Sequence, residues 1–135
     1  MTPLFIDAGY LIALEAADDQ NHDAALRHWR GLLQSLPPLV TTSYVFDEVV
    51  TFFNSRRRNA KAVEIGNSLL RSSAVEFVHV DEQLFYEGWQ FFQRHRDKSY
   101  SLTDCVSFVL MERRGIREAL TFDRHFAQVG FNKLP

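Results

Sequence analysis

Hydrophobic positions along the chain form short continuous runs that alternate with longer stretches in which apolar side chains recur every three or four residues. The short runs are typical of buried strands, and the longer stretches are typical of helices that cover a sheet. We expect strands at residues 4–6, 39–41, 75–80, 118–122 and 131–134. We expect helices at residues 8–17, 22–36, 44–54, 60–70, 81–94, 101–114 and 123–129. This regular alternation predicts an α/β fold with a mostly parallel sheet covered on both faces.

Local signals set several of the helix boundaries. Pro37–Pro38 stops the second helix, because proline cannot donate to the helical hydrogen-bond ladder. Ser43 is the expected N-cap of the third helix, and Asp81 and Ser101 are expected to cap the fifth and sixth. Gly115 is expected to end the sixth helix in the left-handed conformation.

The composition of the chain indicates a single globular domain and excludes several classes of protein. The chain has 135 residues, 46% of them hydrophobic and 24% charged, which suits a single domain over residues 1–135. Its one cysteine, Cys105, lies in an apolar helical pattern and is expected to be a buried thiol. The N-terminus lacks a basic signal-peptide segment, and no apolar run approaches the roughly 18 residues that cross a bilayer. We therefore expect a cytoplasmic protein without a membrane partner.

The formal net charge is −2, from 15 basic and 17 acidic residues. A protein that holds nucleic acid by bulk positive charge is usually strongly basic, so this balance argues against such a protein. A local basic groove remains compatible with it.

Four acidic residues from separate segments are expected at one edge of the sheet. Asp7 directly follows the first strand, and Asp123 directly follows the fourth. Asp104 lies in the first turn of the sixth helix, and Glu48 lies about one turn into the third. Ligands of parallel α/β sheets bind outside the carboxyl ends of the strands, where these acids can converge.

Helix capping is a simpler explanation for three of these acids. Asp7 and Asp123 stand where an N-cap belongs, and Asp104 forms a capping-box pattern with Ser101. Glu48 has apolar neighbours and is expected to be at least partly buried, and a buried carboxylate needs a partner.

Few cations lie near the four acids in sequence, so a hard divalent cation such as Mg²⁺ or Mn²⁺ is the expected counter-charge. A single cysteine and the lack of a histidine pair at ligand spacing argue against zinc.

The segments that carry the acids resemble a known family. They are FIDAGYLIAL at 5–14, TSYVFDEVV at 42–50, YSLTDC at 100–105 and LTFDRHFAQVGF at 120–131. They look like the acidic motifs of PIN-domain ribonucleases, and most of all like those of VapC-type toxins from bacterial and archaeal toxin–antitoxin pairs. The resemblance covers essentially the whole chain. It implies a PIN-like three-layer α/β/α sandwich with four or five strands, and a metal-dependent endoribonuclease that leaves a 3′-hydroxyl and a 5′-phosphate.

The resemblance also implies roles for individual residues. The implied catalytic quartet is Asp7, Glu48, Asp104 and Asp123. We expect Asp7 and Asp104 to ligate Mg²⁺ or its substitute Mn²⁺ directly, and Asp123 to do so directly or through water. Glu48 is expected to hold or deprotonate the attacking water, whereas Asp47 is assigned outward, since one residue along a helix turns a side chain by about 100°. The supporting hydroxyls correspond to Ser43, Thr103 and Thr121, with Ser101 as a further helper.

The basic residues form two concentrations, which are either solvated helix ends or contacts to RNA phosphates. The candidate RNA contacts are Arg56, Arg57, Lys61, Arg96 and Lys98. The five histidines form no constellation, and we interpret each as structural or surface. His125 stands where some relatives carry another acid, which leaves the number of metal ions open.

The resemblance further implies a small antitoxin partner and a homodimer through the early helices. The chain is rich in aromatic residues, which are enriched at protein interfaces. A response-regulator domain needs a paired acid after its first strand and a lysine after its last, but here Asp7 is followed by Ala8, and Lys133 comes too late. A haloacid-dehalogenase-type hydrolase needs an acid at position 9, where this chain has Gly9. The remaining alternatives are a PIN-fold RNA-processing nuclease outside a toxin–antitoxin pair and a noncatalytic PIN-like binding module.

Overall fold

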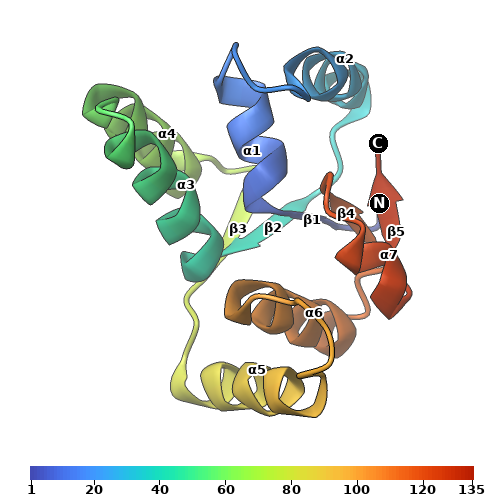
Figure 1. Ribbon diagram of the computed structural model, residues 1–135. Coiled ribbons are helices and arrows are strands. Elements are labelled where there is room, and N and C mark those ends of the chain that lie inside the picture. The colour runs from blue at the N-terminus through green and yellow to red at the C-terminus, as the bar shows by residue number, and fades with distance from the viewer.

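The computed structural model describes residues 1–135 and has a five-stranded sheet at its centre (Figure 1). The strands are β1 (Leu4–Ile6), β2 (Leu39–Thr42), β3 (Val75–Val78), β4 (Glu118–Leu120) and β5 (Asn132–Leu134). Their order across the sheet is β3-β2-β1-β4-β5, and every pairing is parallel. The predicted parallel α/β fold is therefore confirmed.

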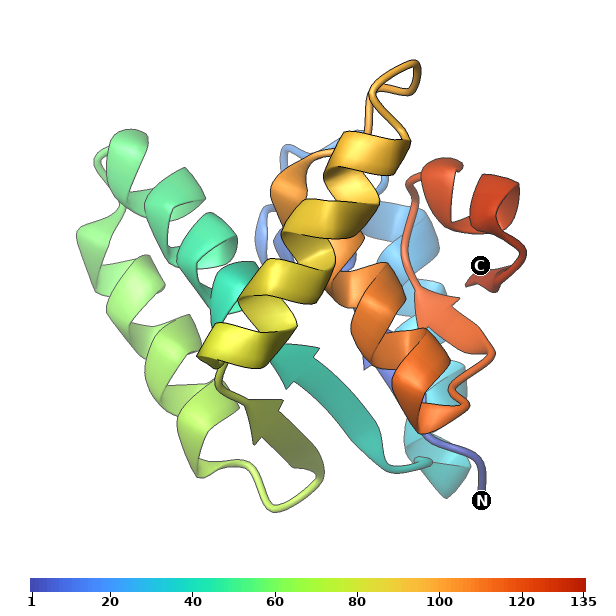
Figure 2. The same cartoon turned by 90° about the horizontal axis from the view of Figure 1, so that it is seen from below.

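Helices cover both faces of the sheet, as Figure 1 shows. They are α1 (Ala8–Glu15), α2 (His22–Leu32), α3 (Ser43–Ser55), α4 (Asn59–Arg71), α5 (Glu82–Arg94), α6 (Leu102–Arg114) and α7 (His125–Val129), with a short 3₁₀ turn at Leu33–Ser35. The helices α1 to α4 lie on one face, and α5 and α6 lie on the other. Seen from the second face, α3 and α4 form a hairpin beside the β3 end of the sheet (Figure 2). The result is a three-layer α/β/α arrangement.

The core lies between the sheet and the two helical layers. Strand β1 is buried along its whole length, which explains why its apolar run is continuous rather than alternating. Phe108 of α6 packs edge-to-face on Phe126 of α7, with ring centroids 4.9 Å apart. Each such fully buried side chain contributes roughly 1.5–3 kcal/mol of transfer free energy. Cys105 is buried and free, as predicted.

Helix α5 approaches α6 closely at Gly88. A Cβ atom built at this position would lie 2.5 Å from Val106 Cγ2 and 3.2 Å from Val106 Cα. Any larger residue would therefore have to push α5 away from α6, because the second of these contacts is to backbone. The glycine holds the outer helix against the helix that carries Asp104.

Several predicted boundaries are corrected by the structure. The N-cap of α3 is Thr42, whose Oγ1 accepts from Val45 N at 3.2 Å, and not Ser43, which already belongs to the helix. The strands β3 and β4 end two residues earlier than predicted, and α7 begins at His125 rather than Asp123. Asp81, Ser101 and Gly115 do terminate their helices as predicted. No helix is long and apolar enough to cross a membrane.

Candidate active site

The strand order reverses beside β1, with β2 and β3 on one side and β4 and β5 on the other. In a parallel α/β sheet, the crevice at such a switch point is where ligands bind. Asp7 follows β1 at this edge, and the segment from Thr121 to Asp123 follows β4. Two of the predicted acids are therefore carried to the switch point by neighbouring strands.

Asp7 occupies the N-cap position of α1 but makes no capping hydrogen bond with its side chain. Its Oδ2 atom instead accepts a hydrogen bond from Thr121 Oγ1 at 2.8 Å, and the residue is only 7% exposed. Burial raises the pKa of Asp7 to about 7; the Thr121 hydroxyl opposes this rise, while the negative charges of Asp104 and Glu48 add to it. The capping explanation therefore fails for Asp7, which is a buried acid facing other acids.

Thr121 connects two of the acids. It is fully buried, and while it donates to Asp7 its Oγ1 accepts from the backbone N of Asp123 at 3.0 Å. One hydroxyl thus fixes both the Asp7 carboxylate and the turn that presents Asp123. The predicted supporting hydroxyl at this position lies in the cluster.

Asp104 takes part in the N-terminal cap of helix α6 and also lies in the acidic cluster. It forms the predicted capping box, since Asp104 N donates to Ser101 Oγ at 3.0 Å and Ser101 N donates to Asp104 Oδ2 at 3.1 Å. The residue is 8% exposed, and burial raises the pKa of its carboxyl group, partly opposed by the Ser101 backbone hydrogen bond and reinforced by the charge of Asp123. The capping box therefore holds a desolvated carboxylate at the start of α6.

His125 lies against Asp123 and Asp104. Its Nδ1 atom is 3.1 Å from Asp123 Oδ1 and 3.7 Å from Asp104 Oδ2, and ligand atoms from the three side chains all lie within 4.8 Å of one another. The structure thus places His125 beside two of the predicted acids, a proximity that its interpretation as a structural or surface residue does not include. The signal in the sequence was its position two residues after Asp123, because His125 N donates to Asp123 Oδ1 across the turn that precedes α7.

Glu48 is exposed as a residue, contrary to the expectation of partial burial. Its carboxyl group is nevertheless desolvated enough to raise its pKa; the Thr103 hydroxyl opposes the rise, and the charges of Asp104, Asp47 and Asp123 strengthen it. Its neighbour Asp47 is exposed and accepts a weak hydrogen bond at 3.4 Å from Thr51 on its own helix. Glu48 thus completes the group of four acids at its solvent-facing side.

The remaining predicted hydroxyls take different places. Thr103 is the hydroxyl that stabilises the ionised form of Glu48, and Ser101 caps α6. Ser43 Oγ accepts from Val80 N at 2.9 Å, which ties the start of α3 to the segment after β3. Ser43 therefore acts in the fold, by a contact that the sequence does not reveal.

The predicted basic residues divide into two groups. Arg56 and Arg57 lie at the tip of the α3–α4 hairpin, while Lys61 is paired with Glu15 Oε1 at 2.8 Å. Arg96 and Lys98 lie in the α5–α6 loop, and Lys98 lines a surface hollow that also contains Arg124 and His125. Lys98 and Arg124 are thus cations at the margin of the acidic cluster, and Arg124, which adjoins Asp123 in sequence, is not among the predicted RNA contacts.

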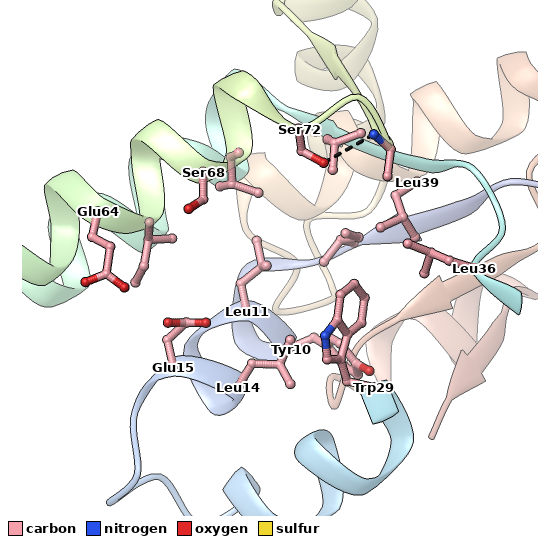
Figure 3. Close-up of a pocket in the computed structure, with 15 residues that line it drawn as sticks. Tyr10, Leu11, Leu14, Glu15, Trp29, Leu36, Leu39, Glu64, Ser68 and Ser72 are labelled. Carbon is pink, nitrogen blue, oxygen red and sulfur yellow. Dashed lines mark hydrogen bonds between the residues drawn. The ribbon is translucent and has the colours of Figure 1, made fainter. Parts of the chain in front are cut away.

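A separate apolar cavity of about 250 Å³ lies between α1, α2, α4 and the sheet (Figure 3). Tyr10, Leu11, Leu14 and Trp29 point into it, and Glu15 and Glu64 lie towards one end (Figure 3). None of the four clustered acids lines this cavity. Its apolar wall does not suit chemistry on a charged substrate, so the acidic cluster is the candidate active site.

The cluster has the donor set of a divalent cation site. Asp104 and Asp123 offer carboxylate oxygens close to His125 Nδ1, a buried nitrogen without a hydrogen-bond partner, and the charge of Asp104 also acts on the buried carboxyl group of Asp7. No lysine or arginine is paired with any of these acids. Desolvated carboxylates without a cationic partner repel one another, and a hard cation removes this repulsion.

Comparison with known proteins identifies the family. The model of the PIN domain matches residues 4–132. The chain belongs to the PIN-domain family. Among curated proteins it is 35% identical over 129 residues to the 23S rRNA-specific endonuclease VapC20 of Mycobacterium tuberculosis, covering 95% of both chains, in each of two strains.

Solved structures agree with this assignment. The crystal structure of Mycobacterium tuberculosis VapC20, described as a Sarcin-Ricin loop cleaving toxin, superposes with a TM-score of 0.84 at 32% identity and 95% coverage of both chains. A toxin–antitoxin complex from Klebsiella pneumoniae shares the fold, with a TM-score of 0.62 at 11% identity, covering 98% of this chain and 96% of the other. The PIN-like three-layer sandwich is therefore confirmed for this member of the family.

Proposed function

We propose that this PIN-domain protein is a Mg²⁺- or Mn²⁺-dependent endoribonuclease and the toxin of a toxin–antitoxin pair. The observation that carries the proposal is the convergence of Asp7, Asp104 and Asp123 from three separate segments on the switch point of the sheet, two of them buried and none paired with a lysine or arginine. Similarity to VapC20 over 95% of both chains supports the ribonuclease and toxin parts.

The residues of the site have different proposed roles in phosphodiester hydrolysis. Asp7, Asp104 and Asp123 would hold the divalent ion, which when bound neutralises the carboxylates and favours attack by water at phosphorus. Thr121 keeps Asp7 and the Asp123 turn in place through its two hydrogen bonds. Glu48, whose pKa is raised, is poised to accept a proton from the attacking water. A 3′-hydroxyl and a 5′-phosphate are the expected products.

The substrate and partners follow from the same relationships. Because VapC20 is described as 23S rRNA-specific, ribosomal RNA is the substrate we propose to test first. The proposed contacts to RNA phosphates are Arg56 and Arg57 on the hairpin, Arg96 in the α5–α6 loop, and Lys98 and Arg124 near the cluster. A cognate antitoxin is the proposed protein partner, as the toxin–antitoxin complex with the same fold suggests. A homodimer and a cytoplasmic location complete the proposal.

The test is RNA cleavage by purified, tag-free protein. Ribosomes, deproteinised 23S rRNA and unrelated structured RNA would be incubated with Mn²⁺, with Mg²⁺ or with a chelator. We expect cleavage only with metal, and a loss of at least about 100-fold in Asp7→Asn, Asp104→Asn and Glu48→Gln. Asp47→Asn is the matched control, because Asp47 is the exposed neighbour of Glu48 and should retain activity.

Two outcomes would contradict the proposal. Cleavage that continues in the chelator, or that is undiminished in both Asp7→Asn and Asp104→Asn, would exclude these acids as the metal-holding catalytic groups. Induced expression of the wild type and of Asp104→Asn in a bacterial host tests the toxin part. Growth arrest by the wild type alone is expected, and unimpaired growth with confirmed RNA cleavage would favour a PIN-fold nuclease that acts outside a toxin–antitoxin pair.

A further inference from the structure

His125 introduces a nitrogen donor into an otherwise oxygen-based cluster. Its Nδ1 atom is buried and has no hydrogen-bond partner, although it lies 3.1 Å from Asp123 Oδ1 and 3.7 Å from Asp104 Oδ2. An unsatisfied buried polar atom destabilises the folded state unless another group interacts with it. The position of Nδ1 between two carboxylates therefore calls for a physical explanation.

The surrounding residues hold the imidazole ring in this orientation. Its Nε2 atom lies 3.2 Å from Ser99 Oγ, and the ring packs edge-to-face against Tyr100 with centroids 5.1 Å apart. The backbone N of His125 donates to Asp123 Oδ1 at 2.9 Å, which fixes the start of α7 relative to the cluster. Ser99 and Tyr100 thus hold the ring, the backbone hydrogen bond holds its residue, and Nδ1 is the ring nitrogen beside the acids.

The contact with Ser99 is the arrangement that ligating histidines commonly show. A histidine that binds a metal through one ring nitrogen usually donates the other N–H to an oxygen, which sets the tautomer. A proton on Nε2, accepted by Ser99 Oγ, leaves the Nδ1 lone pair facing Asp104 and Asp123. A lone pair opposite two carboxylates is repulsive unless a cation lies between them.

A direct ion pair explains the geometry less well. An imidazolium proton on Nδ1 would be expected to point at one carboxylate oxygen, because charge-assisted hydrogen bonds are short and close to linear. Here Nδ1 approaches Asp123 Oδ1 without satisfying hydrogen-bond geometry, and that oxygen already accepts from the His125 backbone. The Nδ1 atom therefore lies within 4 Å of an oxygen of each carboxylate but is hydrogen-bonded to neither.

We propose that His125 is a metal ligand through Nδ1, together with Asp104 and Asp123, and that this nitrogen makes the site favour Mn²⁺ over Mg²⁺. The proposal rests on the metal-dependent function proposed above and adds a residue that determines which ion is bound. Carboxylates suit Mg²⁺ and Mn²⁺ alike, whereas an imidazole nitrogen favours transition-metal ions. An oxygen-only version of this cluster would lose that preference.

The test measures metal binding without RNA. Tag-free wild-type protein would be titrated with Mn²⁺ while free Mn²⁺ is followed by electron paramagnetic resonance, and Mg²⁺ would then be added in competition. Electron spin-echo modulation of bound Mn²⁺ would report a coordinated nitrogen, and labelling of histidine with ¹⁵N would assign that nitrogen to imidazole. The variants are His125→Ala and His125→Asp. The control is His79→Asn, which alters an exposed histidine outside the cluster.

We expect nitrogen modulation in the wild type and in His79→Asn, and its loss in both His125 variants. The ratio of Mn²⁺ to Mg²⁺ affinity should fall on the order of tenfold in His125→Asp, which replaces nitrogen by oxygen. Bound Mn²⁺ without nitrogen modulation in the wild type would overturn the proposal even if both variants unfold, because the isotope experiment needs no variant. Failure of the wild type to bind either ion would instead contradict the metal-dependent function itself.

Discussion

Asp7 is the residue at which burial opposes ionisation most strongly in this site. Its folded-state pKa of about 7 lies above the ordinary value of 3.8. The folded protein therefore binds a proton more tightly than the unfolded chain does, and stability should fall as pH rises from about 4 to about 7. Above that range the buried charge is fully present unless a cation neutralises it.

Asp7→Asn should therefore stabilise the metal-free protein while it abolishes cleavage. The amide keeps an oxygen that can accept from Thr121 but carries no charge, so the gain should be on the order of a few kcal/mol at pH 8 and should vanish near pH 4. Urea denaturation in chelator across this pH range measures the effect. An unchanged free-energy difference between pH 4 and pH 8 would show that Asp7 does not titrate as its burial requires.

The role of the Thr121 hydroxyl can be tested by two matched substitutions, one that removes the hydroxyl and one that keeps it. Thr121→Val keeps the shape of the side chain but leaves the Asp7 carboxylate and the Asp123 N–H without their shared partner. We expect a loss of about 1–3 kcal/mol in unfolding free energy and a large fall in kcat. Thr121→Ser retains the hydroxyl and should recover most of the activity. Equal activity of the valine and serine variants would contradict a positioning role.

Among the elements, the contact between α5 and α6 offers the sharpest stability test. Gly88→Ala places a methyl group against the Val106 backbone and should destabilise the protein by about 1–3 kcal/mol. Gly31→Ala is the matched control in α2, where nothing lies within 4 Å of the new Cβ. It should stabilise by about 0.4–1 kcal/mol through helix propensity and the unfolded state. Thermal denaturation compares the two, and equal shifts in Tm would contradict the close packing at Gly88.

The elements also show which features a sequence can and cannot reveal. Strand β1, the capping box at Ser101 and the acids after β1 and β4 follow from local patterns, so the fold and the region of the site could be predicted. The contact of Ser43 could not be predicted, because its partner Val80 lies 37 residues away. For His125 the nearness to Asp123 is local, but its contact with Ser99, 26 residues away, is not. Side-chain direction at such positions is decided by tertiary packing rather than by periodicity.

At the scale of the whole molecule, the four acids account for more than the entire net charge of −2. The acidic excess is thus concentrated at one edge of the sheet, while cations such as Lys98 and Arg124 line the adjoining surface hollow. A phosphate close to desolvated carboxylates is repelled unless positive charge lies nearby, and these two cations can supply that charge. Affinity for RNA should therefore depend on a few local cations and on bound metal.

Lys98→Ala and Arg124→Ala should each weaken RNA binding and lower the slope of log K against log salt by roughly one unit or less, since each removes at most one phosphate contact. Binding would be measured by fluorescence anisotropy in the Asp104→Asn background, which prevents cleavage. Arg117→Ala is the control, because Arg117 is exposed just before β4, at the opposite end of that strand from the cluster. An equal loss of affinity in Arg117→Ala would mean that RNA is held by general charge, and the assignment of the α5–α6 loop and the start of α7 as the RNA-facing margin of the site would be wrong.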